Sequence, residues 1–259
     1  MATLIRNAKA GHEWTEYELE AYNIRIDYQD TATFFGNAIL PPPTVHPDAL
    51  NAEEAEDAHD KETARLLHHL RSAMIPEEHE SAVADFATHL LEYMGFADPP
   101  RMTRRDKELS FLNCGIRSSA SPDVCVYLER DGIILLVQED KRLKNNVDAT
   151  GQLIAEAIAA FQYVNNKRML HRRDLLKHAV FPGIVMIGTA PRFFKIPVTT
   201  ELNHAVRSGA FPEDPTVVSG YIPPVVADGA GFAVGMLSRN NRRAIFQCYE
   251  AFKKFVVTI

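Results

Sequence analysis

The chain has 259 residues, of which 46% are hydrophobic and 24% are charged. This composition is that of an ordinary globular protein, and it excludes wholesale disorder, a collagen-like repeat and a disulfide scaffold. Three cysteines without C-x-x-C spacing indicate a reducing compartment, and no run approaches the roughly 18 apolar residues of a membrane-spanning helix. The first ten residues lack an apolar block of signal-peptide length, so we expect an intracellular protein of the cytoplasm or nucleus, with no membrane partner.

Charge is distributed unevenly along the sequence. Residues 1–100 carry 6 Lys and Arg against 19 Asp and Glu, a balance of −13, whereas residues 101–259 carry 22 against 15, a balance of +7. A basic region of this kind suits a polyanion such as nucleic acid. The same asymmetry arises when an acidic and a basic part of one molecule pack together, and charge alone favours that simpler interpretation.

Residues 1–75 are expected to form an acidic, helix-bearing arm. Residues 22–28 alternate well enough for a short strand, and the three prolines at 41–43 end any regular element. Residues 62–74 have apolar side chains at helical spacing. These side chains are Leu66, Leu67, Leu70 and Met74.

From residue 76 onward, the patterns predict the order helix, strand, strand, strand, helix, strand. The first helix has an apolar stripe and ends at Gly95. Three strands are predicted over 108–116, 123–129 and 133–141. Asp131 and Gly132 make the last two of these strands a hairpin.

A long helix is predicted to begin at Asp148 or Thr150, both of which are suitable caps. Residues 180–189 follow as a buried strand. The segment 208–231 contains four prolines and is expected to be an irregular surface connection, and 240–257 closes the chain as a helix.

The predicted hairpin gathers side chains that suit a divalent metal ion. Asp123 opens one strand, while Glu139 and Lys141 end its neighbour. Oxygen ligands from one or two carboxylates are typical of Mg²⁺, which keeps its other positions for water and phosphate. Lys141 would then orient or deprotonate the attacking water and offset charge in a phosphorane-like transition state.

The register of the hairpin decides whether the two acids share a face. Asp123 lies opposite Glu139 only if paired residue numbers sum to 262. A two-residue turn gives 263 and separates the acids, whereas a three-residue loop with Gly132 in a left-handed bulge gives 262. A shared site therefore requires the longer loop or a bulge.

The residues Pro122-Asp123 and Glu139-Asp140-Lys141, placed between two helices in this order, resemble the PD-(D/E)XK superfamily of restriction-endonuclease-like proteins. This resemblance implies an α/β fold with an αβββαβ core, a mixed sheet flanked by helices. The core would span residues 76–200 of a single domain 1–259, with the N-terminal arm 1–75 and a C-terminal extension 201–259.

The resemblance also implies roles for individual residues. Asp123, Glu139 and Lys141 would be catalytic, and the metal, Mg²⁺ or Mn²⁺, would be held by Asp123, Glu139 and a helical Glu80. Gln152 would support the lysine. Glu77 and Glu78 compete with Glu80, and Glu156 and Gln162 compete with Gln152.

Segments outside the motif resemble a large, mostly uncharacterised group of mushroom-type fungal proteins. They are residues 14–35, 152–162 and 248–253. Pro-Asp alone is a weak signal, since Pro47-Asp48 is a second copy without strand context. Asp123 could be a turn residue and Glu139 with Lys141 an exposed pair, but their combination with the hairpin and helices favours a site.

The function implied is a metal-dependent nuclease that hydrolyses phosphodiester bonds of DNA or RNA. The alternative is a catalytically silent nucleic-acid- or protein-binding module on the same fold. Arg142, Lys144 and Arg168 are candidate phosphate contacts, although the pattern favours a solvated role for Arg142 and Lys144. Nucleic acid is the expected partner, and the sequence leaves open whether the chain is a monomer or a homodimer.

Overall fold

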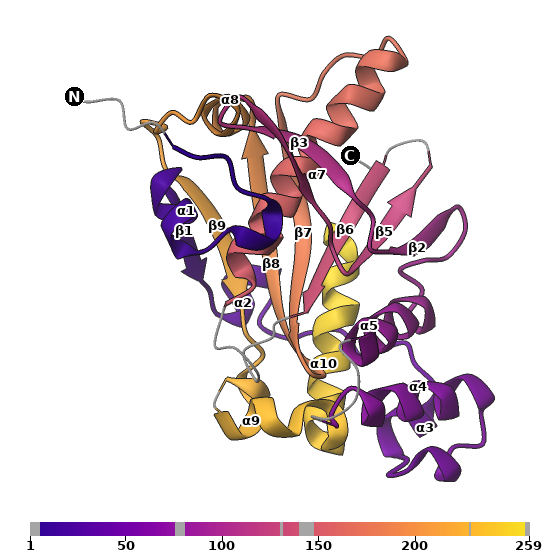
Figure 1. The fold of residues 1–259 in the computed structure, drawn as a ribbon. Coiled ribbons are helices and arrows are strands. Elements are labelled where there is room, and N and C mark those ends of the chain that lie inside the picture. The colour runs from indigo at the N-terminus through magenta and orange to yellow at the C-terminus, as the bar shows by residue number, and fades with distance from the viewer. Residues whose placement is uncertain (1–5, 76–80, 130–131, 140–147, 228, 257–259) are drawn as a thin grey trace.

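The computed structural model describes residues 6–75, 81–129, 132–139, 148–227 and 229–256 (Figure 1). Its strands are β1 (Ile24–Tyr28), β2 (Arg101–Arg105), β3 (Leu109–Asn113), β4 (Ile116–Ala120), β5 (Val124–Leu128), β6 (Gly132–Glu139), β7 (His178–Ile187), β8 (Ala190–Thr199) and β9 (Thr216–Tyr221). Its α-helices are α1 (Glu16–Ala21), α2 (Thr31–Phe35), α3 (Pro47–Asn51), α4 (Lys61–Ser72), α5 (Ser81–Tyr93), α7 (Thr150–Leu170), α8 (Thr200–Ser208), α9 (Gly229–Val234) and α10 (Arg239–Phe252).

Seven strands form one mixed sheet in the order β1-β9-β8-β7-β6-β5-β2, and β3 pairs with β4 in a separate hairpin (Figure 1). Strand β5 runs antiparallel to both of its neighbours, β2 and β6, whereas β7 runs parallel to β6 after the crossover through α7. The protein is therefore α/β, as expected. In the described part of the chain, no helix combines the length and apolar character needed to cross a membrane.

Helices cover both faces of the sheet. One face packs against α4, α5 and α10, with Phe86 and Phe252 among the buried side chains. The other face packs against α7 and α8, and the β3–β4 hairpin lies on the outer side of α7. The predicted buried face of the long helix is confirmed, since all five of its members are buried: Leu153, Ile154, Ala157, Ile158 and Phe161.

The long helix begins where the sequence places it, at Thr150. The main-chain N–H of Thr150 donates to Oδ1 of Asp148 at 2.9 Å, and the Thr150 hydroxyl donates to the same oxygen at 2.5 Å. Asp148 therefore accepts from the first turn of α7, whereas the N-cap position itself is Ala149 and Thr150 is the first residue of the helix.

Two expectations about the strands are wrong, and further elements were missed. The stretch 108–116 is not one strand of the sheet, because Cys114 and Gly115 both have positive φ and turn it into β3 and β4. The sheet strand at this point is β2. The prolines of 208–231 flank β9 instead of excluding it, and β8 with α8 was not expected at all.

The acidic arm is not decoration on a separate core. β1 pairs in parallel with β9, so the arm supplies an edge strand to the main sheet. Ala49, Ala52 and Ala55 are buried in the same cluster as α5 and α10. The boundaries predicted for the core stay a prediction, but strands from both sides of 76–200 complete its sheet.

Candidate functional site

Asp123 is anchored against the end of β6. It precedes β5, and its Oδ2 accepts a hydrogen bond from Nε2 of Gln138 at 2.5 Å. The same oxygen accepts from the main-chain N–H of Glu139 at 2.7 Å. Two donors from one strand therefore fix the position of a half-buried carboxylate.

The hairpin adopts neither register considered from the sequence. Val124 lies opposite Val137, so the paired numbers sum to 261 instead of 262. The pairing shifts between Val126 and Tyr127, where a bulge brings Tyr127 opposite Ile133. A bulge is present, as the shared site required, but it takes the sum only from 260 on the turn side to 261, one short of 262. The expectation of a 262 register is wrong.

The observed register changes which side chain accompanies Asp123. If the β5–β6 pairing is extended by one residue pair beyond Val124 and Val137, Gln138 lies opposite Asp123, in agreement with their hydrogen bond. Because side chains alternate along a strand, Glu139 shares its face with Val137, on the α10 side of the sheet. Gln138 is the neighbour of Asp123 that the sequence interpretation missed.

Polar side chains continue across the sheet beneath α7. Gln138 lies opposite Val185 of β7, and Val185 lies opposite Arg192 of β8. Opposed residues share a face, so Asp123, Gln138 and Arg192 form a row under the first turns of the helix. Gln138 is 2% exposed and Arg192 is 3% exposed.

Asp148 connects this row to the helix. Its Oδ1 lies 3.3 Å from Nη2 of Arg192, and its Oδ2 lies 3.4 Å from Nη1. Burial raises the pKa of the Asp148 carboxyl, but Arg192 and the two hydrogen bonds from Thr150 together lower it further, to below its ordinary value. Asp148 is therefore ionised and holds the start of α7 over the row.

Glu156, in the second turn of α7, is fully buried, and within the described chain neither of its carboxyl oxygens has a hydrogen-bond partner. Burial and the nearby Asp123 charge raise its pKa well above the ordinary value. The Gln152 amide acts in the opposite direction, without reaching hydrogen-bond geometry. Oε1 of Gln138 is also buried and unpartnered. Buried oxygen atoms thus gather near Asp123.

The remaining predicted residues divide into two groups. Gln152 lies in the first turn of α7, half-buried, as expected. Arg168 lies 16 residues further on, about 24 Å along the helix axis, where its Nε donates to the Asp174 carbonyl at 2.7 Å. The residues outside the described part are Glu80, Lys141, Arg142, Lys144, Glu77, Glu78 and Asp140.

A second polar cluster was missed by the sequence interpretation. Tyr127 of β5 and Tyr163 of α7 lie beneath two ammonium groups. Lys107 Nζ is 5.2 Å and 5.1 Å from their ring centres, and Lys167 Nζ is 5.3 Å and 5.9 Å away. Lys167 also donates to the Tyr127 hydroxyl at 3.2 Å. The spacing of Tyr163 and Lys167, one helical turn, was the available signal.

The Tyr–Lys cluster gives its two phenols different pKa values. Burial raises the pKa of Tyr127, but its hydrogen bonds with Tyr163 and Lys167 outweigh burial and leave the pKa lowered. Burial and the neighbouring Tyr127 raise the pKa of Tyr163 to about 12. Tyr127 is therefore the phenol that ionises first.

Among the described residues, no three His, Cys, Asp or Glu side chains are placed to hold a metal ion together. A site near Asp123 would therefore combine carboxylate with amide oxygen, water or phosphate. No family model matches the chain, and no curated protein matches it.

Proposed function

We propose that this protein is a metal-dependent nuclease that hydrolyses phosphodiester bonds of DNA or RNA. One observation carries the proposal: Asp123 is fixed on β6 by two hydrogen bonds, beside buried oxygen atoms of Gln138 and Glu156 that have no partner in the described chain. Buried polar groups are nearly always satisfied in folded proteins. Orphaned oxygen atoms beside a carboxylate therefore favour a site that binds a cation or water.

The order of elements around Asp123 supports this proposal. α5 precedes the antiparallel strands β2, β5 and β6, then α7 crosses over to β7, parallel to β6. With the β3–β4 hairpin as an insertion, this order is consistent with the αβββαβ core that the resemblance implies. Fold order alone does not fix chemistry, which depends on the side chains of the site.

The available donors suit Mg²⁺ or Mn²⁺. Asp123 and Oε1 of Gln138 are hard oxygen ligands on the α7 side of the sheet, whereas Glu139, the second carboxylate expected from the sequence, lies on the other face. A bound Mg²⁺ would supply Lewis-acid polarisation of the phosphate and a more acidic water.

The protein's own groups would prepare this site. Gln138 and the Glu139 N–H hold Asp123 in place, and Asp148 with Arg192 holds α7 above it. Burial and the Asp123 charge raise the pKa of Glu156, which favours its neutral form over a second negative charge beside an approaching phosphate. Lys141 is the predicted group that orients the attacking water, and Arg142, Lys144 and Arg168 are the predicted phosphate contacts.

The observed register favours a second candidate, a catalytically silent binding module on the same fold. It leaves Gln138 opposite Asp123 and turns Glu139 towards the other face. A site with one carboxylate on the working face would hold a metal weakly. The two candidates differ in turnover, which one experiment measures.

The test is to incubate the purified full chain with labelled single-stranded and duplex DNA and RNA, with Mg²⁺ or Mn²⁺ or with EDTA. We expect metal-dependent cleavage that EDTA abolishes. Asp123→Ala should slow cleavage at least about 100-fold, because metal-ion stabilisation contributes several kcal/mol to the transition state. Asp27→Ala, which removes an exposed carboxylate from the opposite edge strand, is the matched control.

Each outcome decides between the candidates. Cleavage that Asp123→Ala leaves unchanged places the chemistry elsewhere. Salt-sensitive binding of nucleic acid by folded protein without any cleavage supports the silent module. If the folded protein neither binds nor cleaves nucleic acid, the nuclease and the nucleic-acid-binding module are both contradicted.

A further inference from the structure

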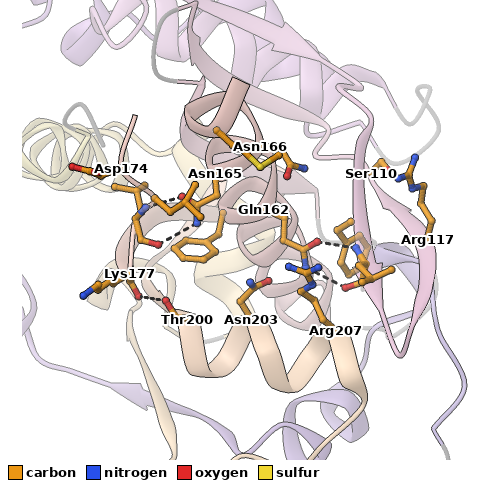
Figure 2. Close-up of a pocket in the computed structure, with 16 residues that line it drawn as sticks. Ser110, Arg117, Gln162, Asn165, Asn166, Asp174, Lys177, Thr200, Asn203 and Arg207 are labelled. Carbon is orange, nitrogen blue, oxygen red and sulfur yellow. Dashed lines mark hydrogen bonds between the residues drawn. The ribbon is translucent and has the colours of Figure 1, made fainter. Parts of the chain in front are cut away.

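A large cavity opens beside the C-terminal half of α7 (Figure 2), and Asp123 is not among the residues that line it. Its volume is about 1080 Å³, and α7, α8, the β3–β4 hairpin and the segment 174–177 line it. Ligand sites for small molecules have volumes of about 300–1,000 Å³. The cavity therefore has room for a complete small molecule.

Side-chain amides of α7 fix two walls of this cavity. Gln162 accepts from the Leu112 N–H at 2.8 Å and donates to the Leu112 carbonyl at 3.1 Å, which attaches β3 to the helix. Asn165 binds both main-chain groups of Leu176 in the same way, at 2.8 Å and 3.1 Å. The walls are thus held in place before a ligand arrives, which lowers the entropic cost of binding.

The third wall, α8, carries a side-chain amide whose oxygen atom lacks a hydrogen-bond partner in the described chain. This atom is Oδ1 of Asn203, and it is buried. Arg207 lies one turn further along α8, and Figure 2 shows both side chains rising from the helix towards Gln162. A ligand that supplies an N–H or O–H donor would satisfy Asn203.

The charges around the cavity favour an anion. Its lining includes the cations Arg117, Lys177 and Arg207 against one acid, Asp174. Within the described chain, none of the three cations forms an ion pair. The rest of the lining offers apolar surface to a flat or apolar group: Phe111, Leu112, Phe161, Met169, Leu175 and Leu176.

We propose that this cavity binds a nucleoside monophosphate. Its phosphate would meet Arg207 and Arg117, an N–H of the base would satisfy Asn203, and the base would lie on the apolar lining. The cations, Asn203 and the apolar lining therefore favour a negative charge, a hydrogen-bond donor and a flat apolar group, respectively. A nucleotide combines these three features in one molecule. Asn165 lies nine residues beyond Glu156, about 14 Å along α7, so this site is separate from the proposed active site and does not depend on it.

The test is calorimetric titration of the full chain with AMP, GMP, CMP and UMP, with inorganic phosphate as a comparison. We expect saturable binding of at least one nucleotide, weaker at high salt and tighter than that of phosphate. Arg207→Ala should weaken binding about tenfold or more, since it removes a charge-assisted hydrogen bond. Asn203→Leu should weaken it about fivefold by removing the acceptor.

Matched variants separate this site from others. Arg207 is exposed, so its replacement should leave the fold intact, and thermal melting checks this for both variants. Arg25→Ala, an exposed arginine on β1, should bind nucleotide like the wild type. Absence of binding to all four nucleotides, phosphate binding as tight as theirs, or unchanged affinity in folded Arg207→Ala and Asn203→Leu would each overturn the proposal. Loss of nucleotide binding in folded Asp123→Ala would also overturn it, by placing the nucleotide at the other end of α7.

Discussion

Arg242 and Glu156 are both ionisable and both buried, at 1% and 0% exposure, but their surroundings differ completely. The Arg242 guanidinium donates four hydrogen bonds of 2.9–3.3 Å to main-chain carbonyl groups. Neither oxygen of Glu156 has such a partner in the described chain. A buried ionisable group is therefore not a single kind of feature.

The comparison separates a structural role from a candidate functional one. The four carbonyls belong to Met236, Leu237, Ala49 and Ala52, so Arg242 joins the acidic arm to the start of α10. Burial lowers the pKa of Arg242, but its hydrogen bonds replace much of the lost hydration. Glu156 has no such replacement, and its unmet demand is what a cation, water or substrate could fulfil.

The largest expected effect is the loss of stability when Arg242, which donates four hydrogen bonds, is replaced. Arg242→Met should lower the free energy of unfolding by about 3 kcal/mol or more, because each buried carbonyl left unpaired costs about 1–3 kcal/mol. Urea unfolding of both proteins measures the difference. Arg243→Met removes an exposed neighbour and should change stability by no more than about 0.5 kcal/mol. Equal losses in the two variants would show that Arg242 does not join the arm to α10.

The next effect concerns the unsatisfied site. Mg²⁺ at a hundredfold excess over its Kd should raise the free energy of unfolding by about 2.7 kcal/mol, because it binds the folded form alone. This stabilisation should disappear in Asp123→Ala and persist in Asp27→Ala. Thermal melts with Mg²⁺ and with EDTA give both values. Equal stabilisation of Asp123→Ala and wild type would place the metal elsewhere.

A smaller effect is the pH dependence of stability in EDTA. The folded pKa of Glu156 is raised above its ordinary value of 4.5, so the folded protein keeps a proton that the unfolded chain releases. Its contribution is complete below about pH 4.5 and is lost as pH rises towards the folded pKa.

The variant Glu156→Gln removes this titration. We expect the wild type to lose stability relative to Glu156→Gln between pH 4.5 and neutral pH, in melts that use matched buffers. Parallel pH profiles would show that Glu156 does not titrate differently in the folded and unfolded states.

The smallest effect concerns the half-buried Tyr–Lys cluster. Its burial and hydrogen bonding lie between those of Arg242 and Glu156. Lys167→Met should raise the pKa of Tyr127, because it removes a hydrogen bond and a nearby positive charge. The ultraviolet absorbance of tyrosinate, followed against pH, detects the change. Lys61→Met, at an exposed position on α4, is the control. An unchanged titration in Lys167→Met would show that Lys167 does not lower this pKa.

The sequence predicted the elements whose pattern is local. The β5–β6 hairpin and α7 are found where expected because alternation, turn residues and helical spacing act within a few residues of one another. The prolines around β9 and the short apolar residues of the arm misled the interpretation. Their roles depend on pairing with β1 and packing against α10, which are contacts between distant segments.

The candidate site was predicted in part for the same reason. Asp123 could be identified from its position before a strand, whereas its partner Gln138 could not, because the bulge at Val126 and Tyr127 sets the register. Glu156 was considered only as an alternative to Gln152. Its burial follows from the packing of α7 on the sheet, which helical spacing alone does not specify.

The pairing of β1 with β9 also has a consequence for the order of events during synthesis. Ile24 lies opposite Thr216, so their contact spans 192 residues, which is 216 minus 24. Contacts between such distant residues form slowly because a long loop must close first. While the ribosome adds the intervening residues, the future edge strand remains unpaired, and unpaired strand edges are prone to aggregate. The charged residues Arg25 and Asp27 on β1 are exposed in the finished fold, and on the nascent chain they would oppose such association until β9 emerges.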